Sequence, residues 1–139
     1  MLAEALERMP HTGPMRLITG IDQADDTSIV CHADGHTADS YPLRLGGVLY
    51  SAALVELGAQ AAAAHASLFG LGHAHMGLVL TISDVTLSVE RIENPDRLVI
   101  TGTRIELLAM AASYRFDVRQ AGAAIASGSV LLSMERVNT

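Results

Sequence analysis

Glu56 is the only acidic residue in the longest apolar stretch of the sequence, "GGVLYSAALVELGAQAAAAHASLFG", which extends from Gly46 to Gly70. A carboxylate that gives up its hydration needs a partner or a chemical task. Apolar neighbours favour the protonated form of a carboxyl group, which suits a residue that donates a proton. We therefore expect Glu56 to act as a catalytic acid. The alternative is a structural carboxyl group that accepts hydrogen bonds from loop backbone or from Arg.

Two histidines precede this stretch and could work with Glu56. A carboxyl group and an imidazole can share the general acid and base roles when their surroundings differ. His36 lies in the irregular segment "DGHTADSYPLRL", whereas His11 lies between two prolines in "PHTGP". The sequence leaves open which of the two approaches Glu56, within one chain or from another subunit. For each, the alternative is a loop imidazole bonded to backbone.

Three further residues of the apolar stretch could bind a substrate. A helix that begins at Gly46 and Gly47 would present free N–H groups and the positive end of its dipole, and both stabilise a developing oxyanion. The two glycines would also let an acyl chain approach without side chains in the way. Gln60 follows Glu56 by one helical turn and could orient a neighbour, with a structural amide as the alternative.

A metal site is the weaker interpretation of the remaining histidines. His73 and His75 flank one Ala, and His65 precedes them in the long stretch, so imidazole ligands for zinc are present. No fixed carboxylate or Cys accompanies them, and we expect no metal. The single Cys31 excludes an intramolecular disulfide, fits a reducing compartment, and is most simply a buried strand residue.

The composition limits the class of protein. The 139 residues correspond to about one domain, 1–139, and half of them are apolar. The net charge of -6 argues against nucleic acid as a partner. The N-terminal "MLAEALERMP" lacks the basic start and apolar run of a signal peptide, and no apolar run is long enough to cross a membrane. We expect a cytoplasmic protein with no membrane partner.

The apolar periodicity predicts one long helix and several long strands. The expected elements are a short helix over Leu2–Met9, strands over Met15–Ile21 and Ile29–Ala33, the long helix over Gly46–Gly70, and strands over Gly77–Arg91, Leu98–Ile105, 113–119 and Ala123–Val137. Strands that follow one another with tight turns form antiparallel sheets. A helix that is apolar on nearly every face must be buried broadly, so we expect the sheet to curl around it.

Gly58 lies in the middle of the predicted helix, where Gly costs roughly 1 kcal/mol relative to Ala. Several alanines surround it, so we expect a close approach of helix and sheet at this point. The order of elements and this packing predict an α+β domain with the hot-dog fold, in which a curved antiparallel sheet wraps a long central helix.

Three motifs of the sequence resemble those of one known family with this fold. "MPHTGPMRLITGI" resembles the "LPHR-x-P" opening of the beta-hydroxyacyl-[acyl-carrier-protein] dehydratases, and "VELGAQAAAA" resembles their "E-A-x-A-Q-A-A" helix segment. In that match Glu56 and Gln60 fall on the family's Glu and Gln. "ENPDRLVITGTRI" is similar to the family's "V-x-PGD-x-L" turn and strand. The resemblance covers most of the chain.

The segment before the helix departs from the family pattern "G-H-F-P-G-x-P-x-x-P-G", whose His is the catalytic partner of the Glu. Gly35 and His36 retain the Gly-His pair, but the residues that follow differ, and His36 is several residues further from Glu56 than the family spacing. The sequence looks closest to a divergent branch associated with aryl-polyene and related lipid-like pathways.

The resemblance implies a dehydratase, a lyase that acts on beta-hydroxyacyl thioesters in fatty-acid or polyene-type biosynthesis. It implies Glu56 with His36 or His11 as the catalytic pair and no cofactor. The implied partners are acyl carrier protein or an acyl-CoA thioester, together with a second copy that joins its sheet edge to edge in a homodimer or higher oligomer. The alternatives are a hot-dog acyl thioesterase and a non-catalytic subunit of a heterodimer with another hot-dog protein.

The arginines could attract an acidic carrier protein. All basic residues except the histidines are Arg, because the sequence contains no Lys. Five of these arginines are candidates for a docking patch, although a scattered solvated set is the alternative. They are Arg16, Arg44, Arg91, Arg97 and Arg104.

Overall fold

The computed structural model of the protein describes residues 16–69 and 75–136, and these form one six-stranded sheet with one long helix. The expected helix over Leu2–Met9 lies outside the described residues. The elements in chain order are β1 (Gly20–Ala24), β2 (Ser28–Ala33), the short 3-10 helix η2 (Ser51–Ala53), α2 (Leu54–Phe69), β3 (His75–Leu87), β4 (Leu98–Leu107), β5 (Ala111–Gln120) and β6 (Ala123–Arg136).

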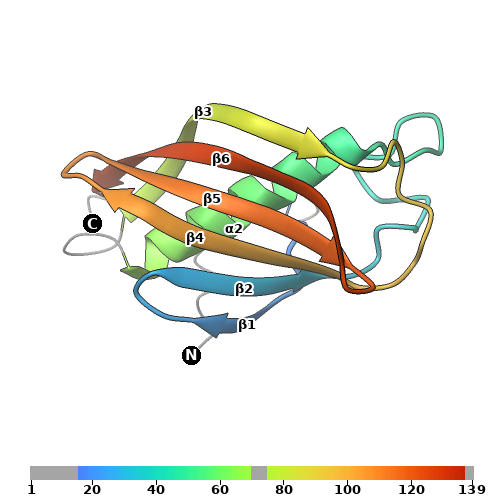
Figure 1. Ribbon diagram of the computed structural model, residues 1–139, viewed down its shortest axis with the longest axis horizontal. Coiled ribbons are helices and arrows are strands. Elements are labelled where there is room, and N and C mark those ends of the chain that lie inside the picture. Colours follow the sequence, from blue (N-terminus) through green and yellow to red (C-terminus); the bar gives the residue numbers. More distant parts are fainter. Residues whose placement is uncertain (1–15, 70–74, 137–139) are drawn as a thin grey trace.

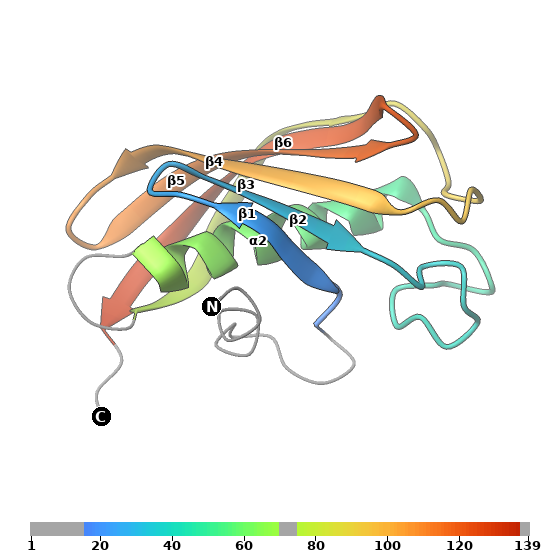
Figure 2. The same ribbon diagram turned by 90° about the horizontal axis from the view of Figure 1, so that it is seen from below.

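The sheet is antiparallel throughout, with the strand order β1-β2-β4-β5-β6-β3. Helix α2 lies along one face of the curved sheet, and strands β1 and β3 form the two edges (Figures 1 and 2). This arrangement confirms the predicted hot-dog fold. Among the described residues, no helix is both long and apolar enough to cross a bilayer.

The helix is buried as its composition predicts, since every residue from Leu57 to Ala66 is buried. Gly58 lies at a close approach of helix and sheet, because a Cβ atom there would lie 2.2 Å from the Phe116 ring of β5. The same ring covers Gly128, its cross-strand partner in β6. Two glycines thus form the space that one aromatic side chain fills, as the position of Gly58 predicts.

The helix begins later than predicted, at Ser51 in its 3-10 turn and at Leu54 in regular α geometry. Gly46 and Gly47 have positive φ values of 58° and 79° and form the centre of a tight turn. Leu45 and Val48 close this turn with two backbone hydrogen bonds of 2.8 and 3.1 Å. Two consecutive residues with positive φ are typical of a type I′ turn, a conformation that glycine adopts without strain. The prediction of a helix from Gly46 was therefore wrong.

The first strand is also displaced from its predicted range of Met15–Ile21. Residues 16–19 form no regular secondary structure, and β1 continues to Ala24 through a bulge between Ile21 and Gln23. The turn that follows is fixed by the Asp25 carboxylate, which accepts hydrogen bonds from the N–H groups of Thr27 and Ser28 at 2.9 and 2.8 Å. An Asp that binds the backbone ahead of it favours a turn, so the turn between β1 and β2 begins at Asp25.

The later strands follow their predicted ranges closely, and β5 alternates between buried and accessible positions as expected. The predicted alternation in β3 is absent, because all residues from Thr81 to Glu90 are exposed. β3 pairs only with β6 among the described strands, so one long edge of the sheet carries partly exposed apolar side chains. They are Val79, Ile82, Val85 and Leu87, each about two-fifths exposed.

Candidate active site

Glu56 and Gln60 lie together on the face of α2 that meets the segment before β1. The Gln60 side chain is fully buried, and its Nε2 donates a hydrogen bond to Oε1 of Glu56 over 3.1 Å. Its Oε1 accepts the N–H of Leu17 at 2.8 Å and that of Ile18 at 3.4 Å. The amide is therefore held from both ends, and it fixes the orientation of the half-buried carboxyl group of Glu56.

Tyr41 is a member of this site that the sequence analysis missed. Burial, and next the negative charge of Glu56, raise the pKa of the Tyr41 phenol to about 12. The side chain is half-buried and packs on the hydrophobic core. It also lines a cavity of about 260 Å³ together with Pro42, Asp34 and residues 16–19. The Tyr41 phenol is therefore protonated, lies near enough to Glu56 for the carboxylate charge to raise its pKa, and forms part of the wall of this cavity.

Glu56 is not among the residues that line that cavity, and Gln60 connects it to the cavity wall. Leu17 and Ile18 line the cavity, and their backbone N–H groups are bonded by Gln60, which in turn binds Glu56. A carboxyl group oriented by an amide and accompanied by a phenol can exchange a proton with a molecule that enters beside it. The only sequence signal for Tyr41 was its position in "SYPLRL", in the segment that departs from the family pattern.

His36 lies in a different polar cluster, at the end of β2. Its side chain is 1% exposed, and Nε2 lies 2.7 Å from the carbonyl oxygen of Asn94, to which it donates. Gln120 of β5 donates to the same carbonyl at 2.8 Å and to that of Asp96 at 2.7 Å. Nδ1 of His36 is buried and has no hydrogen-bond partner among the described residues. These contacts tie the end of β2 to the "ENPDR" turn.

The remaining candidates are distributed as follows. His11 lies outside the described residues. Gly46 and Gly47 lie at the tip of the tight turn, four residues or more before Ser51, so they do not form the first turn of the helix. The N–H of Ser51 is already bonded to the carbonyl oxygen of Glu90 at 3.0 Å.

His65 is a buried structural residue. Its Nε2 lies 2.7 Å from the Asp25 carbonyl oxygen and its Nδ1 lies 2.6 Å from the Tyr114 hydroxyl, while the ring stacks on Phe69. Burial lowers the pKa of His65, and the charge of Arg104 lowers it further. In the part of the chain that the structure describes, no group of three or more His, Cys, Asp or Glu side chains could hold a metal ion.

The five candidate arginines do not form one patch. Arg44 and Arg91 line one cavity, and Arg16 lines the cavity beside Tyr41. Arg97 forms a bidentate pair with Asp34, at 3.0 Å for both bonds. Arg104 donates to the carbonyl oxygen of Phe69, at the C-terminal end of α2.

A family model described as ApeP-like, ApeP dehydratase, matches residues 3–136, which is nearly the whole chain. The chain belongs to the ApeP-like dehydratase family. The expected relationship to a divergent branch of hot-dog dehydratases is thereby confirmed. None of the curated proteins that were compared with the chain matches its sequence significantly.

Solved structures support the same fold at low sequence identity. The dehydratase heterocomplex ApeI:P from Xenorhabdus doucetiae is similar with a TM-score of 0.80 and 17% identity, over 98% of this chain and 92% of that one. A mutant thioesterase from Pseudomonas aeruginosa gives 0.75 and 14%, over 99% and 95%. A thioesterase from Haemophilus influenzae gives 0.67 and 16%, over 86% and 80%. At these identities the structural likeness shows the hot-dog fold alone.

Proposed function

We propose that the protein dehydrates a beta-hydroxyacyl thioester that is carried on acyl carrier protein. The observation that carries this proposal is the position of Glu56, which is half-buried on the central helix and oriented by Gln60. Tyr41 and the adjoining cavity provide a protonated neighbour and a space for the acyl chain. Membership in a dehydratase family supports the reaction type.

The reaction removes water from the acyl chain and needs a base and an acid. The base takes the proton next to the thioester carbonyl, the acid gives a proton to the beta-hydroxyl group, and a carbon–carbon double bond forms as water leaves. We assign the acid role to Glu56 and the base role to an imidazole, a division that needs no cofactor. Tyr41 lies near the Glu56 carboxyl group and serves to position it.

His11 is the imidazole that we propose as the partner. The alternative, His36, is 1% exposed, and its Nε2 already donates to a backbone carbonyl. The His36 side chain also does not line the cavity beside Tyr41. Exchanging each histidine for Asn separates the two assignments. His11→Asn should lose dehydration and keep the fold, whereas His36→Asn should mainly affect the fold.

We infer that two hot-dog chains join along β3. This edge carries exposed apolar side chains, and unpaired strand edges of this kind favour the addition of another strand. The second chain could be an identical copy or another hot-dog protein, and the relative from Xenorhabdus doucetiae is described as a heterocomplex. Sedimentation of the purified protein tests this inference, because a homodimer would have twice the mass of the 139-residue chain.

A second candidate function is that of a partner subunit without its own turnover. The burial of His36 favours this function. His36 corresponds to the catalytic His of the beta-hydroxyacyl-[acyl-carrier-protein] dehydratases, but here its side chain makes structural contacts. Offering the purified protein a beta-hydroxyacyl thioester distinguishes the possibilities. Enoyl absorbance supports the dehydratase, release of free thiol indicates a thioesterase, and activity that appears only with a second hot-dog protein indicates the partner role.

A further inference from the structure

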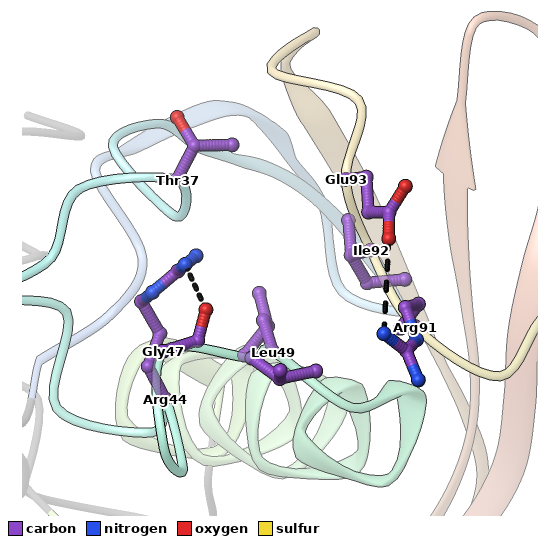
Figure 3. A pocket seen from close by; sticks show the side chains of 8 residues that line it. Thr37, Arg44, Gly47, Leu49, Arg91, Ile92 and Glu93 are labelled. Carbon is purple, nitrogen blue, oxygen red and sulfur yellow. Dashed lines mark hydrogen bonds and ion pairs between the residues drawn. The ribbon is translucent and has the colours of Figure 1, made fainter.

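A second cavity, of about 200 Å³, lies between the loop before the helix and the segment after β3. Figure 3 shows Arg44 and Gly47 on one side and Arg91 and Glu93 on the other, with Thr37 at the rim. This cavity has no residue in common with the one beside Tyr41. Both are built by the same loop, because Arg44 follows Tyr41 by three residues.

Backbone carbonyl groups hold the Arg44 side chain, and an aromatic ring accompanies that of Arg91. Arg44 donates to the carbonyl oxygens of Gly47 and His36, the second over 3.4 Å, so the tight glycine turn fixes its guanidinium group. The segment that carries Arg91 is joined to the loop by the Ile92 N–H, which donates to the Leu49 carbonyl oxygen at 2.8 Å. Arg91 also lies over the Tyr50 ring, 5.9 Å from its centre.

The charges that line the cavity do not balance. Two guanidinium groups face a single carboxylate, that of Glu93, and its closest approach to Arg91 is 4.0 Å. An exposed pair at this separation is weak. The Nε of Arg44 is buried and has no hydrogen-bond partner among the described residues. In a chain of net charge -6, the residues that line this cavity carry a surplus of one positive charge.

We propose that the Arg44–Arg91 cavity binds the phosphate group of a phosphopantetheine arm. The planar fork of a guanidinium group matches phosphate oxygens, and two forks on opposite walls can bind one anion together. The inference depends on the proposed function, because the thioester end of the same arm would lie at Glu56. The loop 34–49 then contributes to both ends, with Tyr41 near the reacting group and Arg44 near the phosphate.

The test compares pantetheine with its phosphorylated form, each titrated into the full chain by calorimetry without any turnover. The Arg91→Gln variant is expected to bind phosphopantetheine about tenfold more weakly, the loss typical of one charge-assisted hydrogen bond, and pantetheine unchanged. Arg91→Lys keeps the charge without the fork and should show an intermediate loss. Arg119→Gln is the matched control, because Arg119 is exposed on β5, lies 3.7 Å from Asp117 and does not line the cavity.

The same titration with holo carrier protein and with coenzyme A identifies the source of the phosphate. Weaker binding of either one to Arg91→Gln supports the proposal and names that source. Equal binding of phosphopantetheine by the wild-type and Arg91→Gln proteins would overturn it, as would an equal loss for pantetheine. If the protein binds phosphate through Arg91 but does not dehydrate the substrate, the phosphate site is supported and the proposed reaction is wrong.

Discussion

The Nε2 of Gln60 lies 3.1 Å from the Oε1 of Glu56, and the Oε1 of the same amide lies 2.8 Å from the N–H of Leu17. One buried side chain thus connects the candidate acid on the central helix to the segment that lines the cavity. The position of Glu56 is linked to the segment before β1 through this amide.

Replacing Gln60 by Leu should remove both functions of the amide. The variant leaves the buried Leu17 N–H without its acceptor, which costs about 1–3 kcal/mol, and it removes one hydrogen bond from the Glu56 carboxyl group. We expect a lower free energy of unfolding in urea and a lower dehydration rate. Gln60→Glu is the companion variant, because it keeps an acceptor for Leu17 but places two carboxyl groups side by side. Wild-type stability in Gln60→Leu would contradict this role.

Tyr41→Phe removes the phenol beside Glu56 and retains the ring that packs on the core. Because loss of one hydrogen-bonding group at a reacting centre typically costs about 1.4 kcal/mol or more, we expect kcat to fall roughly tenfold. The pKa of Tyr41, raised to about 12, keeps the phenol protonated in any ordinary assay. The wild-type rate should therefore show no alkaline limb from this residue below about pH 10. A limb that appears there and vanishes in Tyr41→Phe would be inconsistent with the structure.

His65 should make the protein less stable in mild acid. Its pKa is lowered in the folded state, mainly by burial, so the unfolded chain binds a proton more readily than the folded one. The free energy of unfolding should then fall as the pH drops below about 6.5, with a slope of at most about 1.4 kcal/mol per pH unit. The charged groups that act on the ring are Arg104, Asp25 and Asp26, and the Tyr114 hydroxyl faces it as well.

The measurement is urea unfolding from pH 7.5 to pH 4.5, with His65→Gln as the control that should remove most of the slope. The pKa of Asp25 is lowered by hydrogen bonds from Thr27 and Ser28, so this residue also favours unfolding in acid, but only near its own ordinary pKa of about 4. A slope that is the same with and without His65 would assign the effect to other groups.

Gly58→Ala should destabilise the protein although Ala is the better helix former by about 1 kcal/mol. The new methyl group would lie 2.2 Å from the Phe116 ring, and overpacking of this kind costs about 1–3 kcal/mol. The double variant with Phe116→Leu should recover part of the loss, because the smaller side chain leaves room. Thermal unfolding of the four proteins tests this, and strict additivity of the two substitutions would argue against the contact.

The sequence predicts the parts of the fold that depend on local pattern. The alternation of β5, the turn at Ala121 and Gly122, and the packing of Gly58 on the sheet follow from periodicity and from the special properties of glycine. Glycine is also the source of the main error, because the same residue type permits a close approach in one place and a positive φ in another. Gly46 and Gly47 belong to the second kind.

The candidate site is predicted only where its residues lie on one helix. Glu56 and Gln60 are one turn apart, so their proximity follows from helix geometry. Tyr41 and His36 lie in the irregular segment before the helix, where no periodicity relates sequence distance to distance in space. The structure therefore had to show that Tyr41 lies near Glu56 and that His36 bonds to Asn94.

The central claim concerns one carboxyl group and is tested most directly by Glu56→Gln. The amide is nearly the same size as the carboxyl group, and its oxygen can still accept the Gln60 hydrogen bond, so folding should be preserved. The measurement is the rate at which a beta-hydroxyacyl carrier-protein substrate gains enoyl absorbance, compared between the two folded proteins. We predict a loss of at least about a hundredfold, the lower range for removal of a general acid. Undiminished turnover in the folded variant would show that the chemistry takes place without Glu56.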